Sequence, residues 1–204
     1  MRNYGSMMRR IFSVAVAVAA LSLPASVGAN PAAEARLKDK QGQLTAEVAK
    51  PAPDRARVDS LFDELIDYEA FAKDSLGKSW ADLNDDQRRE FTDLLKRLVR
   101  AAYRKNLEKT KGYDVEFKGF KKKKRGVVVM TVAKHRKNTR EEPVTIDYVM
   151  RLQGDEWRVV DIVTERSSLT RNYRRQFQRV IRKESFAALV DKMKKKLAKE
   201  ERTG

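Results

Sequence analysis

The sequence contains no cysteine and a single histidine, His135, among its 204 residues. The absence of cysteine excludes a disulfide-stapled scaffold, a thiol nucleophile and a thiolate metal site. One histidine excludes a multi-histidine zinc site and most histidine-dependent catalytic triads, and this one lies in the basic stretch 134–137. The chain also lacks a glycine-rich phosphate loop, a G-x-S-x-G motif and internal repeats. We therefore expect no catalytic residue, no metal ligand and no cofactor.

Residues 1–29 have the organisation of a cleavable export signal. A pair of arginines precedes an unbroken run of 13 apolar and small residues from 11 to 23, and Val27-Gly28-Ala29 fits a cleavage site. The run rises only about 20 Å as a helix, less than the ~30 Å of a hydrocarbon core, so it is a poor membrane anchor. An uncleaved anchor is the alternative, and both readings place the rest of the chain outside the cytoplasm. We predict a periplasmic protein, cleaved near Ala29.

The chain is strongly basic, with 45 lysines and arginines against 29 aspartates and glutamates and a formal net charge of +16. In a cytoplasmic protein this excess would point first to nucleic acid. An exported protein instead meets anionic lipid headgroups, to which each lysine or arginine near the surface contributes about 1 kcal/mol. We therefore expect anionic membrane surfaces, and no nucleic acid, among its partners. Plain solvation of a charge-rich domain explains any single run of charge equally well.

A chain cleaved at Ala29 retains 204 − 29 = 175 residues, enough for one core and too few for two ordinary domains. Residues 30–53 predict a polar helix and a proline-containing linker, and residues 54–204 predict a single domain. Asp54 can cap a helix whose apolar residues recur at i, i+3, i+4 and i+7, and Asn84 with Gln87 forms a capping-box pattern. Helices are expected over residues 30–50, from Asp54 to Leu65, through Phe71 to Gly77, and from Asn84 past Leu107 to Gly112.

Beyond Gly112 the hydrophobic period changes from helical to alternating. Strands are predicted over residues 113–117, 126–133, 144–152 and 157–164. Their short connections require antiparallel hairpins, and the last strand is apolar on nearly both faces, which predicts a central position. Two helices follow, the second capped by Ser185. The pattern predicts an α+β domain, a curved antiparallel sheet of about four strands packed by N- and C-terminal helices.

Several motifs occur in a fixed order along the chain. They are Leu76-Gly77-Lys-Ser-Trp80, Gln87-Arg88, Phe91, Tyr103, Trp157-Arg-Val-Val-Asp161, Glu165, Ser168-Leu169, Asn172-Tyr173-Arg174-Arg175-Gln176-Phe177 and Phe186-Ala-Ala-Leu189. In order and spacing they resemble the MlaC/Ttg2D family, the soluble phospholipid-binding components of a retrograde lipid transport system. Arg166 is a departure, since the family usually has a small residue there.

The resemblance implies an NTF2-like or cystatin-like fold with an apolar cavity between sheet and helices. It also implies a phospholipid ligand, an inner-membrane ABC transporter complex and an outer-membrane lipoprotein complex as partners, and a chain that acts as a monomer. Side chains suited to line the cavity are Tyr148, Met150, Trp157, Ile162, Leu169, Tyr173 and Phe177. From sequence alone the same residues equally suit a packed core, because both need apolar side chains at strand and helix spacing.

Three functions remain open at this point. The first is a carrier that shuttles phospholipid between membranes, and the second is a basic adaptor of the same fold that docks to an acidic partner without lipid. The third, an NTF2-like enzyme, is disfavoured because Asp161 and Glu165 lie about 13 Å apart on one strand face, too far to act as paired carboxylates. A salt bridge from these acids to the Arg174/Arg175 region is expected instead.

Overall fold

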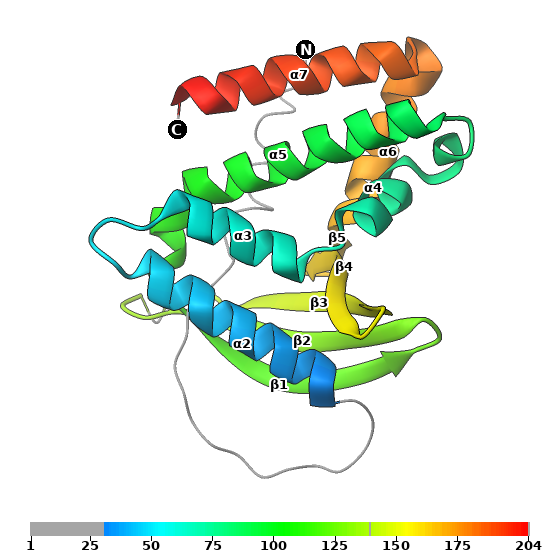
Figure 1. Ribbon diagram of the computed structural model, residues 1–204. Helices are drawn as coiled ribbons and strands as arrows, with labels where there is room; N and C mark the ends of the chain where they lie inside the picture. Colours follow the sequence, from blue (N-terminus) through cyan, green and yellow to red (C-terminus); the bar gives the residue numbers. More distant parts are fainter. Residues whose placement is uncertain (1–30, 139, 204) are drawn as a thin grey trace.

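The computed structural model describes residues 31–138 and 140–203, which form a curved antiparallel sheet flanked by helices (Figure 1). The predicted export signal lies outside the described residues. The elements are α2 (Pro31–Val48), α3 (Arg55–Leu65), α4 (Tyr68–Leu76), the 3₁₀ turn η1 (Gly77–Trp80), α5 (Asp85–Thr110), β1 (Tyr113–Lys123), β2 (Gly126–His135), β3 (Val144–Gln153), β4 (Glu156–Thr164), β5 (Ser167–Ser168), α6 (Leu169–Lys183) and α7 (Phe186–Thr203). The α+β prediction is confirmed, with a two-residue fifth strand added.

Local capping fixes where the helices begin. The Asp54 carboxylate accepts hydrogen bonds from the backbone N–H groups of Ala56 and Arg57 at 2.8 and 3.2 Å, which starts α3. The capping box of α5 is reciprocal: the Gln87 N–H donates to Asn84 Oδ1 at 2.9 Å, and the Asn84 N–H donates to Gln87 Oε1 at 3.0 Å. Both starts confirm the sequence predictions.

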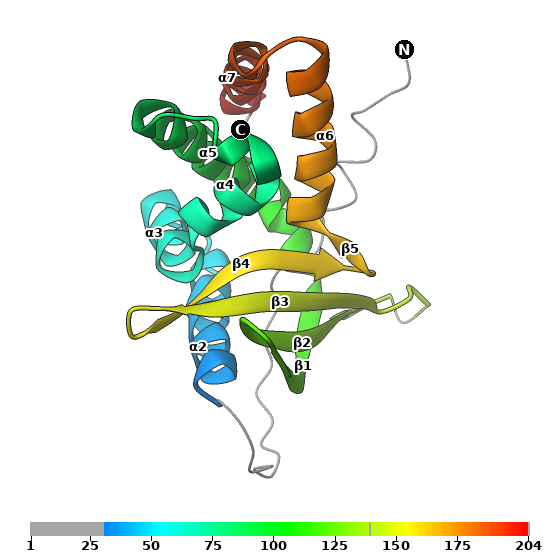
Figure 2. The same cartoon turned by 90° about the vertical axis from the view of Figure 1, so that its right-hand side faces the viewer.

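The strands follow one another in the order β1-β2-β3-β4-β5, and each is antiparallel to the next, as the short connections predicted. Two irregularities in register bend the sheet. One lies in β1 between Phe117 and Phe120, where Gly119 has a φ of 86°, and the other lies between β3 and β4 at Val149/Met150. Such bulges increase the local twist and curvature of a sheet. One face of the curved sheet is turned toward α2 and α3 (Figures 1 and 2).

The prediction that strand 157–164 is central is wrong. On one side β4 pairs with β3 along its length, but on the other it pairs only with the two residues of β5. The chain between α3 and α4 covers part of the remaining edge, where the Asp67 N–H donates to the carbonyl oxygen of Val159 at 3.0 Å. Val159 and Val160 are each 1% exposed. The middle of β4 is therefore buried on both faces, which the alternation of apolar residues cannot distinguish from a central place in the sheet.

The turn from β4 to β5 is tight although it contains no glycine. Glu165 and Arg166 have φ angles of 48° and 66°, a left-handed conformation that costs a non-glycine residue on the order of 1 kcal/mol or more. The Glu165 N–H donates to the carbonyl oxygen of Thr145 at 3.1 Å and anchors the turn to β3. Arg166, at the position where the family usually has a small residue, thus preserves the turn geometry at a cost in strain.

Helices α4, α5, α6 and α7 form a second layer beyond the sheet (Figure 2). Its centre is aromatic: Phe177 lies edge-on to Phe91 at 5.5 Å between ring centroids and stacks on Tyr173 at 5.2 Å. Phe71 contacts Tyr173 edge-on at 6.4 Å. Pairs of this kind contribute about 0.5–1.5 kcal/mol beyond their buried area. This helical layer and the inner face of the sheet share one continuous apolar core.

Candidate functional site

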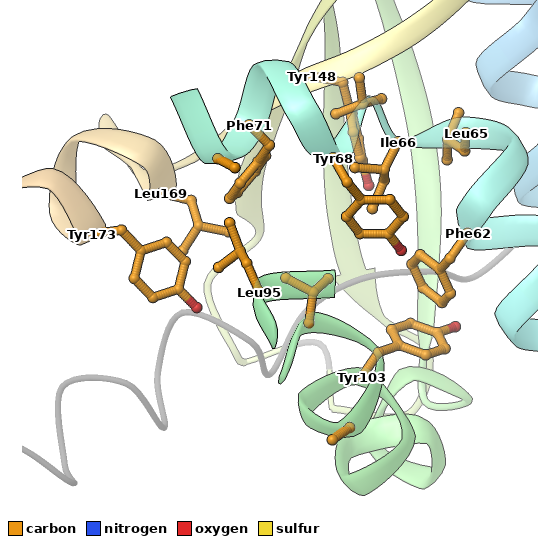
Figure 3. Packing of buried hydrophobic residues seen from close by; sticks show 14 of the residues in the cluster. Phe62, Leu65, Ile66, Tyr68, Phe71, Leu95, Tyr103, Tyr148, Leu169 and Tyr173 are labelled. Carbon is orange, nitrogen blue, oxygen red and sulfur yellow. The ribbon is translucent and has the colours of Figure 1, made fainter. Parts of the chain in front are cut away.

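A small cavity lies between the sheet and the helices α2 and α3. Its volume is about 30 Å³, roughly the share of one water molecule in the liquid. It is lined by Gln41, Leu44, Phe62, Leu65, Ile66, Tyr148, Val159 and Ile162. Figure 3 shows four of these residues, and the lining is apolar apart from the Gln41 amide and the Tyr148 hydroxyl.

One polar contact crosses this cavity from α2 to the sheet. Gln41, which is buried, donates from Nε2 to the Tyr148 hydroxyl at 3.3 Å. Burial raises the pKa of Tyr148 to about 12, so the phenol stays protonated at neutral pH. Within the described residues the buried Gln41 Oε1 accepts no hydrogen bond, and a buried unsatisfied acceptor costs about 1–3 kcal/mol. The contact between α2 and the sheet is therefore an imperfect one.

An ion pair holds α2 to the end of α3, and a hydrogen bond holds it to the start. The buried ammonium of Lys40 pairs with Glu64, and Glu47 accepts a hydrogen bond from the Asp54 N–H at 2.9 Å while pairing with Lys50. The hydrogen bond from Lys40 lowers the pKa of Glu64, and those from Lys50 and the Asp54 backbone lower the pKa of Glu47. Both carboxylates are thus ionised at neutral pH, and this layer relies on charge as well as on apolar packing.

The seven predicted lining residues fall into two regions of the core. Tyr148 and Ile162 are paired across β3 and β4 and border the cavity. Met150 is fully buried on the same face of β3, and Trp157 lies half-buried at the start of β4. The remaining three, Leu169, Tyr173 and Phe177, are buried on α6 in the helical layer. The assignment of all seven to a lipid cavity stays a prediction.

Sequence reasoning missed most of the helical side of the cavity. Leu65 and Phe62 belong to an apolar stripe that predicted α3 as an amphipathic helix, but nothing in that stripe separates cavity wall from ordinary core. Ile66 follows the helix, and Gln41 is a polar residue of a polar helix, so neither carried a signal. Their roles depend on how α2 and α3 lie across the sheet.

Asp161 has a structural role at the start of α6. Its carboxylate accepts hydrogen bonds from the Ser168 hydroxyl at 2.6 Å and from the Thr170 N–H at 2.9 Å. The predicted salt bridge to the Arg174/Arg175 region is wrong, because those guanidinium groups donate to uncharged oxygens of other residues. A hydroxyl and a backbone N–H therefore supply the hydrogen bonds that the Asp161 carboxylate needs. Sequence spacing alone cannot distinguish this arrangement from an ion pair.

His135 closes the loop after β2. Its Nδ1 accepts hydrogen bonds from the N–H groups of Lys137 and Asn138 at 3.1 and 2.9 Å, and Tyr113 packs edge-on to the ring at 4.9 Å. A ring nitrogen that accepts two hydrogen bonds carries no proton. Among residues 31–138 and 140–203 no group of three or more potential metal ligands comes together. The imidazole thus has a turn-forming role.

The outer face of α6 is a row of arginines. Arg174, Arg175, Gln178, Arg179 and Arg182 line an open groove of about 350 Å³. No acidic residue occurs between Leu169 and Lys183, so no carboxylate of α6 itself offsets this charge. The opposite face of the helix, with Tyr173 and Phe177, is buried. The helix therefore joins the aromatic core to a strongly cationic surface.

These features define a domain that encloses apolar space between a curved sheet and helices and presents no reactive group at that space. The family model of the MlaC protein matches residues 32–195. No curated protein matches the chain. Among solved structures, a phospholipid-binding protein from Ralstonia solanacearum, determined in complex with a phospholipid, is similar with a TM-score of 0.71 and 24% identity, over 82% of this chain and 98% of that one.

The chain belongs to the MlaC family. Proteins of this family are periplasmic, non-enzymatic lipid carriers. Within the described residues, no helix combines the length and the hydrophobicity needed to cross a bilayer.

Proposed function

We propose that this protein is a soluble carrier that holds a diacyl phospholipid between its sheet and helices and shuttles it between outer- and inner-membrane complexes. The observation that supports this most strongly is the family match over residues 32–195. The similar Ralstonia protein, whose structure contains a phospholipid, supports it as well. A diacyl lipid exposes on the order of 30 methylenes, each costing about 0.8 kcal/mol in water, so a carrier has to enclose them. Enclosure needs apolar walls and no catalytic group.

In this proposal the lipid tails widen the small cavity beside Tyr148. Ligand pockets measure about 300–1,000 Å³, whereas the cavity measures about 30 Å³. The walls have to separate to admit the tails, and we expect α2 to part from the sheet at the contact of Gln41 with Tyr148, where the Gln41 carbonyl is unsatisfied. The proposed lining remains Tyr148, Met150, Trp157, Ile162, Leu169, Tyr173 and Phe177.

The proposed setting is the periplasm, with the signal peptide removed near Ala29. The proposed partners are an inner-membrane ABC transporter complex and an outer-membrane lipoprotein complex, which a monomeric carrier would visit in turn. The groove of α6 and the run Lys121–Arg125 supply charge for contact with anionic membrane surfaces. Since the Debye length falls from ~10 Å at 0.1 M salt to ~3 Å at 1 M, binding to phosphatidylglycerol vesicles should weaken steeply with salt. Salt-independent binding would remove these charges from the docking model.

The alternative function is a basic adaptor that docks to an acidic membrane partner without lipid. The small volume of the cavity favours it, since an interior filled by side chains needs no ligand. The arginine groove of α6 would then be the principal functional surface.

Extraction of protein purified from the periplasm distinguishes the two functions. Native mass spectrometry and organic extraction should find co-purified diacyl lipid in about stoichiometric amount if the protein is a carrier. A clean mass of the chain alone, from several preparations under non-denaturing conditions, would favour the adaptor.

A further inference from the structure

A stripe of cations on α5 faces a pair of carboxylates on α3. Lys96, Arg100 and Arg104 recur at intervals of four residues, so they lie on one side of α5. Lys96 Nζ lies 2.8 Å from Asp63, Arg100 forms a two-pronged contact with Asp63, and Arg104 lies 3.0 Å from Asp59. Arg100 also approaches Asp59 at 3.6 Å. Three cations thus share two carboxylates across the seam between the helices.

The match between these charges is incomplete. The five side chains are only 18–33% exposed, so solvent compensates them poorly. The buried Asp59 Oδ1 accepts no hydrogen bond within the described residues. Beside them the Tyr68 hydroxyl is buried, and burial raises the pKa of Tyr68, so its O–H stays protonated and can donate a hydrogen bond to an oxyanion. The seam therefore holds three cations against two carboxylates, and the Tyr68 hydroxyl is a further donor.

This cluster adjoins the wall of the cavity. Phe62, one turn along α3 from Asp59 and adjacent to Asp63, lines the cavity. On the other side of the seam its ring packs against Tyr103 of α5, the neighbour of Arg104, with centroids 4.2 Å apart (Figure 3). The charged cluster therefore lies beside the cavity wall, next to Phe62.

We propose that Lys96, Arg100 and Arg104 form a binding site for the phosphate of a lipid headgroup, and that Asp59 and Asp63 occupy it while the cavity is closed. The proposal rests on the carrier function proposed above. Arginine forks match phosphate oxygens in two-pronged geometry, and such charge-assisted hydrogen bonds are about twice as strong as neutral ones. The site recognises the phosphodiester that phospholipids share and that diacylglycerol lacks. Lipid entry and the separation of Asp59 and Asp63 from the cations of α5 then occur together.

The test compares two lipids with identical chains, phosphatidylglycerol and diacylglycerol, loaded from vesicles into delipidated protein. The native protein should retain phosphatidylglycerol about tenfold or more better than diacylglycerol. In Arg100→Gln/Arg104→Gln, retention of phosphatidylglycerol should fall about tenfold while that of diacylglycerol stays unchanged. The matched control is Arg89→Gln/Arg97→Gln, which removes two exposed arginines from the same helix, where they pair with Asp86 and Glu201. The control should behave like the native protein.

Two further variants keep the test decisive if the arginine variant fails to fold. Asp59→Asn/Asp63→Asn removes the competing carboxylates and should raise retention of phosphatidylglycerol alone. An equal rise for both lipids would mean that α3 has merely loosened, which contradicts the phosphate site. Combining all four substitutions removes both guanidinium groups and both carboxylates, leaves Lys96 as the one remaining charge of the cluster, and should remove most of the preference between the lipids.

The failure of this proposal is distinct from the failure of the carrier function. A native protein that retains both lipids equally, or a folded arginine variant that retains phosphatidylglycerol like the native protein, overturns the phosphate site alone. A native protein that retains neither lipid overturns the carrier function, and the phosphate site with it.

Discussion

The helical layer and the α2–α3 layer are built from different chemistry although they share one core. In the helical layer, rings such as Phe91 and Phe177 interlock, and Phe91 is 0% exposed. In the α2–α3 layer, buried Lys40 and Gln41 stand among the apolar residues, and the Gln41 carbonyl is unsatisfied. The small cavity lies in the second layer.

This difference indicates that the helical layer maintains the fold, whereas the α2–α3 layer can move. Close packing makes the helical layer costly to open, because every displaced ring loses contacts and leaves a void. Charged and polar contacts across α2 and α3 exchange for water at much lower cost, since the ions are rehydrated on separation. The α2–α3 layer is therefore the side on which the core can admit a ligand, and four predictions break or sharpen this comparison.

The largest effect is expected for Tyr148→Arg at the cavity wall. A cation among acyl chains costs several kcal/mol, so lipid retention should be lost. Retention is measured by organic extraction of the folded variant, with circular dichroism as the test of folding. Tyr148→Phe keeps the ring and should retain lipid. Normal loading of the arginine variant would remove this face of the sheet from the cavity.

Phe177→Ala tests the other layer. The residue stacks on Tyr173 and meets Phe91 edge-on, so truncation should lower the free energy of unfolding by about 3–5 kcal/mol. Urea denaturation measures this. Because Phe177 also belongs to the proposed lining, the lipid retained per folded molecule should fall as well. If that retention stays at the native value, the helical layer only maintains the fold and Phe177 does not line the lipid cavity.

Acid should loosen α2 before it affects α6. The pKa values of Glu47 and Glu64 lie below their ordinary value of 4.5 in the folded protein. Their stabilising contribution is therefore complete above pH 4.5 and is lost as the pH falls below it toward the folded-state values. Hydrogen exchange, corrected for the intrinsic pH dependence, should show protection lost first in α2. Equal loss in α2 and α6 would contradict a charge-dependent layer.

The smallest effect is expected at the two residues that most resemble catalytic groups. His135→Gln and Glu165→Gln change two residues that do not line the cavity. Each should leave lipid transfer between vesicles within about threefold of the native rate, since transport breaks no bond. A bell-shaped pH profile of transfer that disappears in Glu165→Gln would contradict the carrier and favour an enzyme.

The sequence predicted the elements well because their determinants are local. The capping residues Asp54 and Asn84 and the change of hydrophobic period after Gly112 each depend on neighbours within a few residues. The position of β4 was mispredicted because burial on two faces arises from helices distant in the sequence. The partners of Asp161 were missed for a different reason: they are close in sequence, but a carboxylate is satisfied by hydroxyl and backbone donors as well as by a guanidinium group.

The candidate site was predictable only in part. Alternation along β3 identified Tyr148 as inward-facing, but it carries no information on which helix lies opposite. The contact of Gln41 with Tyr148 joins residues 107 apart in sequence, and the contact of Arg100 with Asp63 in the seam between α3 and α5 joins residues 37 apart. Helical periodicity predicts that a face is buried and does not predict what it is buried against.

The outer edge of the sheet affects how readily copies of this protein associate with one another. In the described part of the chain β1 is the last strand, and its outer edge is open to pairing with a second sheet. Lysines 118, 121, 122 and 123 stand along that strand. Neighbouring strands lie about 4.8 Å apart, so two such edges would bring like charges into close contact. A chain with an exposed edge thereby resists fibre-like self-association without a covering element.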